Sequence, residues 1–181
     1  METLDLETLK YPIGRFVPPT SVSGEQLERY INDIKGFPED LKKEVANLTD
    51  EQLDTRYRPD GWTLRQVVHH CADSHMNSFI RFKLALTENK PTIKPYEEAL
   101  WAELPDTKEM PINSSLEILN GLHKRWSVLL ESFTERELAR TYIHPEHNKE
   151  STLAQVIANY SWHCKHHLAH ITTTKQTYNW R

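Results

Sequence analysis

Glycine and cysteine are scarce in this chain of 181 residues, which holds five glycines and two cysteines. So few glycines leave no glycine-rich loop that could cradle phosphate, and few means of forming tight hairpins. The two cysteines, Cys71 and Cys164, form no closely spaced pair. Their spacing argues against a disulfide framework and indicates a reducing, cytoplasmic setting.

Excess charge and long hydrophobic runs are also lacking. The formal net charge of −4 provides no basic field that would attract nucleic acid. No apolar run approaches the length of a bilayer span, so we expect no membrane partner, and the acidic start at residues 1–5 is unlike a signal peptide. With 38% hydrophobic and 27% charged residues, we expect a soluble, single domain over residues 1–181.

Helix-start signals recur along the chain. In a capping box, Ser or Thr at the N-cap and Glu or Gln three residues later satisfy two backbone N–H groups. The pattern occurs at Ser23/Gln26, Thr49/Gln52, Thr63/Gln66, Ser114/Glu117, Thr134/Glu137 and Thr152/Gln155. Each box opens a segment with apolar residues at helical spacing, and no alternating strand pattern competes with it. The sequence therefore predicts an all-α fold.

Four of these starts lead into long helices, in the layout of a four-helix bundle. We predict long helices over residues 24–48, 64–87, 115–132 and 153–176, and short extra helices near 50–55 and 135–140. The proline-containing segment up to Pro19 is predicted to be extended. Residues 88–113, with four prolines, are predicted to form a long irregular crossover connection with a turn of helix at 96–104.

Four of the ten histidines crowd together near the C-terminus, at His163, His166, His167 and His170. Neutral imidazole is the commonest protein ligand for zinc, nickel and similar metals. At about 100° per residue, His163 and His167 fall in the middle of the apolar stripe of their helix. His166 and His170 straddle the boundary of that stripe. We expect the first pair to face the bundle interior, and the second to lie around the site or at the surface.

A third metal ligand would have to come from another helix, and the adjacent pair His69-His70 is the obvious source. On the helix over 64–87, His70 borders the apolar stripe on the side of a polar strip that includes Ser74 and Arg81, whereas His69 points away. His70 is therefore the better third ligand. Inward histidines that were merely buried would be hard to satisfy, and they would repel one another if charged, which favours a metal site over hydrogen-bonded core residues.

We predict no metal ligand among the two cysteines and three further histidines. Cys71 lies on the core stripe and is predicted to be a packed thiol, whereas Cys164 is predicted to be partly exposed. His123, on the third long helix, and His144 and His147, in a predicted loop over 142–150, are expected at the surface. His144 could also lie over the mouth of the site.

Several segments carry a family resemblance. They include Tyr11-Pro12-Ile13-Gly14, the run from Gly61-Trp62-Thr63 to His69-His70, Ala72-Asp73-Ser74-His75, and Trp162-His163 followed by His166-His167 and Ala169-His170-Ile171. With these segments the chain resembles the DinB-like superfamily of four-helix bundles, and more closely its YfiT branch of metal-dependent hydrolases. The match covers nearly the whole chain.

The resemblance implies a ligand set and an assembly. It places the metal ligands at His70, the second histidine of the paired motif, and at His163 and His167, the His-x-x-x-His of the last helix. It also implies a homodimer, one divalent ion per subunit that is zinc or nickel, and an unusual connection order of the four helices.

Three histidine ligands leave at least one coordination position open, as in catalytic sites. A hydrolase in which the metal activates water to attack a small-molecule substrate is our principal expectation. Asp73, Glu97 and Glu98 are the weak candidates for its base.

Two alternatives remain open. Relatives in the superfamily resemble enzymes that conjugate bacillithiol to electrophiles, so a thiol S-transferase is the main one. In it, a low-molecular-weight thiol would occupy the open position and Arg81 and Asn77 would hold its carboxylates. The other is a metal-stabilised or metal-sensing bundle, which the open coordination position and the lack of a basic patch disfavour.

Overall fold

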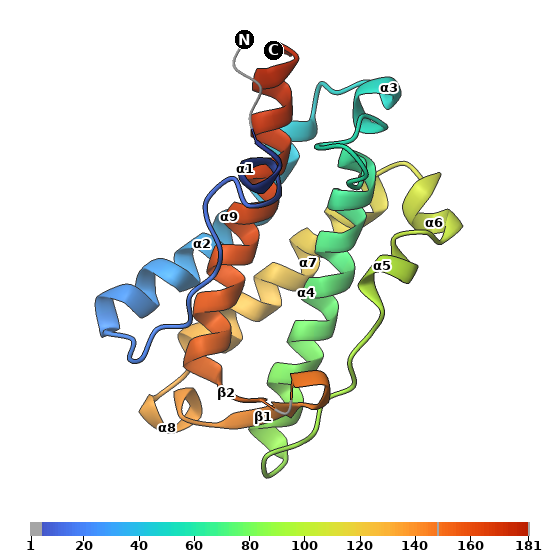
Figure 1. The fold of residues 1–181 in the computed structure, drawn as a ribbon. Coiled ribbons are helices and arrows are strands. Elements are labelled where there is room, and N and C mark those ends of the chain that lie inside the picture. Colours follow the sequence, from blue (N-terminus) through green and yellow to red (C-terminus); the bar gives the residue numbers. More distant parts are fainter. Residues whose placement is uncertain (1–4, 148, 181) are drawn as a thin grey trace.

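Four long helices dominate the computed structural model, which describes residues 5–147 and 149–180, except the side chains of residues 147 and 149. They are α2 (Gly24–Val45), α4 (Leu64–Thr87), α7 (Asn113–Glu131) and α9 (Leu153–Thr177), shown in Figure 1. Each predicted range agrees with the observed one to within three residues at either end. The predicted four-helix bundle is confirmed.

Side-chain caps explain where most helices begin. Capping boxes form at Ser23, Thr49, Thr63, Thr134 and Thr152. The sixth predicted box, Ser114/Glu117, does not form, because α7 already begins at Asn113 and its N-cap, Ile112, has no side chain that could cap.

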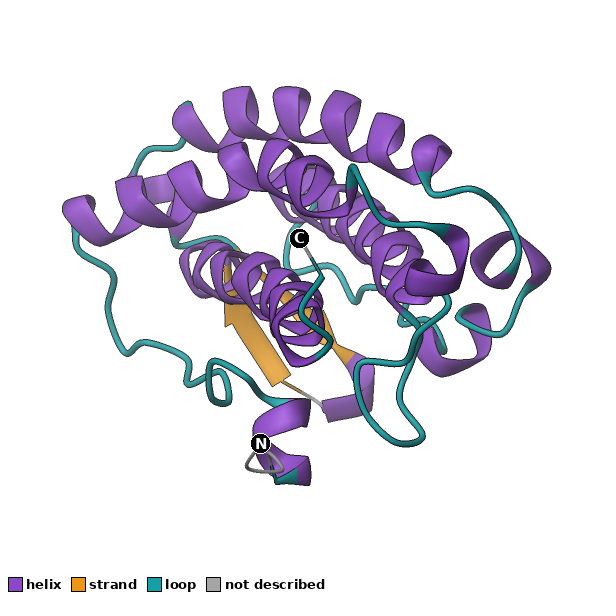
Figure 2. Cartoon of the chain, turned by 90° about the horizontal axis from the view of Figure 1, so that it is seen from above, coloured by secondary structure: helices purple, strands orange, loops and turns teal. Residues whose placement is uncertain are grey.

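The helices pack in an order that differs from their order in the chain. α2 packs against α9 and α7, and α4 packs against the same two helices, so that the consecutive helices α2 and α4 are diagonal in the bundle. Figure 2 shows the arrangement from above. The connection over 46–63 therefore crosses one end of the bundle, and it carries the short helix α3 (Asp50–Leu53). This order agrees with the unusual connectivity that the resemblance implies.

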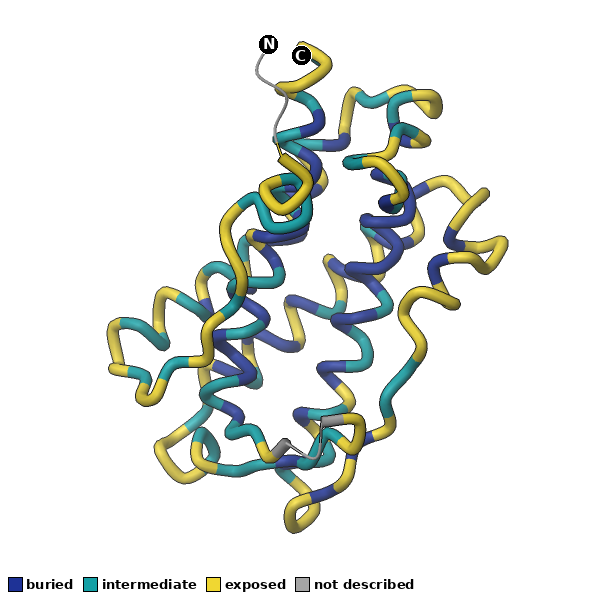
Figure 3. The backbone as a smooth tube through the Cα atoms, in the orientation of Figure 1, coloured by how far each residue is buried: buried dark blue, intermediate teal, exposed yellow. Residues whose placement is uncertain are grey.

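The core lies between the four helices, whose inward faces are buried in Figure 3. All four contribute large side chains that are fully buried: Ile34, Phe37, Leu41, Leu64, Phe82, Leu119, Trp126, Leu130, Leu153, Ile157 and Ile171. Burying one such side chain stabilises the fold by roughly 1.5–3 kcal/mol. One core therefore draws on most of the chain, although the single domain over 1–181 stays a prediction.

The N-terminal segment contains a helix where extended structure was predicted. α1 (Leu6–Lys10) begins after Asp5, whose carboxylate accepts from the backbone N–H groups of Glu7 and Thr8. It ends before Pro12, which cannot continue a helix. The prediction of extended structure is wrong for residues 6–10, because the Asp5 cap begins a helix before the first proline is reached.

A small hairpin, which was not predicted, accompanies the helical bundle. β1 (Thr141–His144) and β2 (Lys149–Thr152) pair antiparallel around a 3-10 turn, η1 (Pro145–His147), in the segment predicted to be a loop. The strand β1 also bonds to the crossover connection, since Ile93 donates to the carbonyl of Ile143 and Ile143 donates to that of Pro91. In Figure 1 the hairpin closes one end of the bundle.

Three short helices complete the fold. α5 (Glu98–Trp101) and α6 (Pro105–Lys108) interrupt the crossover connection, α5 within the predicted turn at 96–104, and α8 (Glu135–Leu138) follows α7 as predicted. Over the described residues, none of the helices has the length and apolarity needed to cross a membrane.

Candidate metal centre

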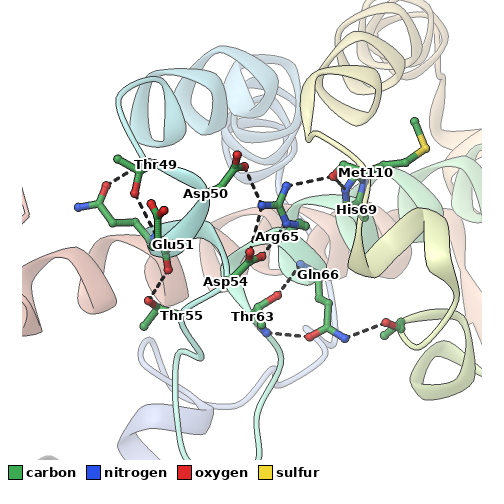
Figure 4. A network of polar contacts seen from close by, with 12 residues as sticks. Thr49, Asp50, Glu51, Asp54, Thr55, Thr63, Arg65, Gln66, His69 and Met110 are labelled. Carbon is green, nitrogen blue, oxygen red and sulfur yellow. Dashed lines mark hydrogen bonds and ion pairs between the residues drawn. The ribbon is translucent and has the colours of Figure 1, made fainter.

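A buried guanidinium anchors the first turn of α4 and so places the histidines that follow. Arg65 pairs with Asp54 at 2.7 Å and Asp50 at 2.8 Å, and it donates to the carbonyl of Met110 at 3.1 Å. Figure 4 shows this network joining α3, α4 and the loop before α7. Because charge-assisted bonds in a fixed fork allow little movement, they hold this end of the helix in place. His70 follows five residues later.

His69 is buried against α7 and lies outside the group of converging histidines. Its Nδ1 lies 2.7 Å from the hydroxyl of Ser115, and its Nε2 lies 3.1 Å from the carbonyl oxygen of Met110. Both ring nitrogens are engaged, so neither is free for a metal ion. His69 therefore helps to dock the connection and α7 on α4.

His70 of α4 and His163 and His167 of α9 converge inside the bundle. Their ring centroids lie 4.4 to 5.5 Å apart, and one possible ligand atom from each lies within 4.8 Å of the others. His163 and His167 share a helical face because they are four residues apart. The structure thus brings the three predicted residues together. That they bind a metal stays a prediction.

Burial keeps these three imidazoles neutral. It lowers the pKa of His70 to about 4, with the charge of His166 as the second cause. It also lowers the pKa values of His163 and His167 well below the usual range, and the neighbouring histidines add to the effect. A neutral imidazole has a lone pair to offer a metal. Three such nitrogens fit zinc or nickel better than calcium or magnesium, which prefer oxygen.

The lowered pKa values predict that the metal-free protein loses stability in mild acid. The unfolded chain has histidine pKa values near 6.5, so it binds more protons than the folded chain below that pH. Stability should therefore be full above about pH 6.5 and fall toward pH 4, by about 1.4 kcal/mol per pH unit for each such histidine. Asp73, whose pKa burial raises to about 6 with some help from Asp106, acts in the opposite direction.

Urea unfolding of the metal-free protein between about pH 7 and pH 5 measures this dependence. The midpoint should decline, because several histidines outweigh Asp73 and Glu98, two carboxyl groups whose pKa values burial raises. A midpoint that stays constant or rises would contradict the burial of neutral histidines.

A second group of histidines, His166, His167 and His170, also has possible ligand atoms within 4.8 Å of one another. It shares His167 with the first group. In addition, Nε2 of His170 lies 3.1 Å from the carbonyl oxygen of Lys10, and its Nδ1 lies 3.4 Å from Nδ1 of His167. Because the nitrogens of His170 have these partners, we interpret it as a support for His167.

Both His166 and His170 are buried, so the surface position is wrong for them. His166 stacks on Trp162 at 4.3 Å between ring centroids and on Tyr11 at 5.9 Å, and His170 stacks on Tyr57 at 4.0 Å. Tyr11 and Tyr57 come from segments far from α9 in the chain. Helical phase cannot show such cover, because it describes one helix alone.

The predicted positions of two other side chains also need correction. His123 is 1% exposed and Cys164 is 2% exposed, so the predicted surface positions are wrong. Cys71 is a buried free thiol, as predicted. His144 lies partly buried on β1, and the side chain of His147 lies outside the described residues.

His75 and His123 form a buried pair that was not predicted to be part of the site. Nδ1 of His75 lies 2.7 Å from Nε2 of His123, and Nε2 of His75 lies 3.0 Å from Nδ1 of His163. The sequence signal that could have revealed this pair is His75 itself, a histidine in the middle of the apolar stripe of α4. Burial, followed by the charges of His123 and His163, lowers the pKa of His75 well below the usual range.

The candidate bases differ in their surroundings. Asp73 lies half-buried on α4, three residues beyond His70, and its pKa of about 6 is near the value that suits a general base. Glu97 and Glu98 are exposed around the start of α5. Asn77 donates to the backbone carbonyl of Asp73 and so turns toward its own helix.

This chain belongs to the DinB superfamily, whose model matches residues 34–171. The helical bundle and the inward-facing histidines of α4 and α9 are therefore features of a member of this superfamily. The match includes all three converging histidines.

Similar proteins cover almost the full length of the chain. A Bacillus mycoides (strain KBAB4) protein named "putative metal-dependent hydrolase" is 50% identical over 175 residues, which is 97% of this chain and 100% of that protein. A Bacillus cereus (strain B4264) protein of the same name is 51% identical over the same shares. Among solved structures, YfiT from Bacillus subtilis matches with a TM-score of 0.94 and 47% identity, over 96% of this chain and 99% of YfiT. YfiT is described as "a probable metal-dependent hydrolase with an unusual four-helix bundle topology".

Proposed function

We propose that this protein is a metal-dependent hydrolase in which His70, His163 and His167 hold one divalent ion. The observation that carries the proposal is the convergence of three neutral imidazoles from α4 and α9. The names of its relatives and the description of YfiT support the same activity. Thiol transfer is named in none of these relatives, so we place hydrolysis first.

The three donors fit an ion with an open coordination position. When bound, a divalent ion supplies Lewis acidity and lowers the pKa of a coordinated water toward neutrality. The protein contributes the position of three nitrogens on two rigid helices. It also contributes a surrounding shell of aromatic rings, since Trp62 packs on His70 at 4.7 Å between centroids and Tyr160 packs on His163 at 5.3 Å.

A pocket of about 340 Å³ next to Tyr160 is the place we propose for a small-molecule substrate. The hydroxyl of Tyr160 lies 3.2 Å from that of Ser74, which in turn lies 3.4 Å from Nε2 of His163. Arg81 also lines the pocket, and its buried Nε has no hydrogen-bond partner among the described residues. A carboxylate or similar acceptor on the substrate would satisfy that donor.

The metal, the assembly and the compartment remain parts of the proposal. We propose zinc or nickel, because nitrogen donors accept both and availability decides between them. The homodimer rests on the family resemblance. A cytoplasmic setting is supported by the two free thiols, Cys71 and Cys164, which a reducing compartment preserves.

Metal analysis combined with a substrate screen tests the proposed function. The protein purified under metal-replete conditions should contain one divalent ion per chain. It should turn over at least one member of a panel of esters, amides and phosphoesters without added thiol. His163→Ala should lose both properties, whereas Lys165→Ala, which changes an exposed residue between the ligands, should keep them.

Two results would overturn the proposed hydrolase activity. Turnover that requires bacillithiol, measured with an electrophile such as monochlorobimane, would replace it with the thiol S-transferase. A protein without stoichiometric metal under replete conditions would exclude both enzymes.

A further inference from the structure

A continuous line of imidazoles crosses the bundle from α2 to the candidate metal centre. Nδ1 of His123 lies 2.6 Å from the carbonyl oxygen of Ile34, and its Nε2 lies 2.7 Å from Nδ1 of His75. Nε2 of His75 lies 3.0 Å from Nδ1 of His163. The line therefore joins one backbone carbonyl to one candidate ligand through two histidines that are not ligands.

The carbonyl at the start of this line is available because of a proline. In an α-helix the carbonyl of residue 34 would accept from the N–H of residue 38, but Pro38 stands there, inside α2, and has no N–H. Ile34 is fully buried, so its carbonyl needs another donor. His123 supplies that donor from the facing helix α7.

Aromatic packing holds the two intermediate rings in place. Phe37 contacts both, with ring centroids 5.2 Å from His75 and 5.8 Å from His123. Trp126 contacts the same two rings at 5.9 and 5.6 Å. The rings have little freedom to turn, so the hydrogen bonds between them are well defined.

The carbonyl sets the direction of every hydrogen bond in the line. A carbonyl only accepts, so His123 must carry its proton on Nδ1, and in a neutral ring Nε2 then has the lone pair. His75 must therefore donate from Nδ1, which leaves its Nε2 to accept. His163 must donate from Nδ1 in turn, and its Nε2 is left without a proton. Burial keeps His123 neutral by lowering its pKa to about 4.

We propose that His75 and His123 are positioning residues that hold the proton of His163 on Nδ1 and so present the lone pair of its Nε2 to the metal. This inference rests on the proposed metal centre for its purpose, but the proton positions can be measured without metal. Partners of this kind fix the tautomer and orientation of a ligating histidine.

His167 has a shorter support of the same kind. Nε2 of His170 donates to the carbonyl of Lys10 at 3.1 Å, which leaves Nδ1 of His170 to accept from Nδ1 of His167 at 3.4 Å. Nε2 of His167 is then also left with a lone pair. The longer contact predicts a smaller effect of changing His170 than of changing His75.

Histidine-selective ¹⁵N labelling tests the inference in the metal-free protein. Long-range ¹H–¹⁵N spectra distinguish the two neutral tautomers, and the resonances of His163 can be assigned by their loss in His163→Gln. We expect His163, His75 and His123 to be protonated on Nδ1. A wild-type His163 protonated on Nε2 would overturn the inference.

Variants of His75 provide the second readout, zinc affinity measured against a chromophoric chelator. His75→Leu should weaken zinc binding about 10–100-fold. His75→Gln should retain most of the affinity, because its amide oxygen can accept from His163 while its NH₂ donates to His123. Zinc binding by His75→Leu that equals wild type would overturn the inference.

Ser127→Ala is the matched control. The Ser127 hydroxyl donates to the backbone carbonyl of His123 at 2.7 Å and is equally buried, but it lies outside the line of imidazoles. Its loss should lower the melting temperature and leave zinc affinity unchanged. If His75→Leu does not fold, the wild-type tautomer and the Gln variant decide the question.

The two proposals fail in different ways. A protein with hydrolase activity but with His163 protonated on Nε2 would refute only the positioning role. A protein with the expected tautomers but no turnover would refute only the proposed activity.

Discussion

Replacing His167 with alanine is expected to abolish stoichiometric metal binding while the helical fold persists. His167 lies close to both of the other candidate ligands, with ring centroids 4.8 Å from His70 and 4.4 Å from His163. Loss of an outer partner of a ligand costs about 10–100-fold in metal affinity, so loss of the ligand itself should exceed that range. Equilibrium dialysis against zinc measures the affinity, and hydrolysis should fall with it.

Lys165→Ala serves as the comparison for His167→Ala. Lys165 is exposed on the same helix and pairs with Asp33 at 2.6 Å, a contact that contributes about 0–1 kcal/mol. The metal affinity of the Lys165→Ala variant should equal that of wild type. If His167→Ala bound zinc as tightly as Lys165→Ala does, His167 would not be a ligand.

Replacing Trp126 with alanine should have the largest effect on stability. Trp126 is fully buried, and its ring contacts those of Phe82, Tyr160 and His123 at 5.3 to 5.6 Å between centroids. Removing a side chain of this size from a core costs about 3–5 kcal/mol. Urea or thermal unfolding, followed by circular dichroism, measures the loss.

Trp126→Phe should be much milder than Trp126→Ala. Phenylalanine keeps most of the apolar volume, and it also removes an indole N–H that has no hydrogen-bond partner among the described residues. Equal losses in the two variants would contradict this expectation, because they would show that the stability depends on the indole N–H and not on the apolar volume of the ring.

Most of the bundle could be predicted because its helices are marked locally. The predicted range of α4 coincides with the observed one, since Thr63 and Gln66 form the capping box that begins it. The hairpin β1–β2 was missed because its strands are short and one of them is held by a remote segment, through Ile143 and the crossover connection. Such pairing leaves no periodic pattern in the chain.

The candidate ligands could be predicted from helical phase, but their supports could not. His163 and His167 share a face with the apolar residues of α9, whatever α9 packs against. The position of His123, in contrast, depends on a carbonyl of another helix that Pro38 leaves without its usual donor. Only the packing of α7 against α2 brings these two residues together.

X-ray absorption at the zinc edge of the zinc-loaded protein tests the central claim most directly. If His70, His163 and His167 hold the ion, the spectrum should show three imidazole nitrogens at about 2.0–2.1 Å and a further light atom that completes the site. A sulfur neighbour at about 2.3 Å, or a shell with fewer than three imidazoles, would contradict the three-histidine centre.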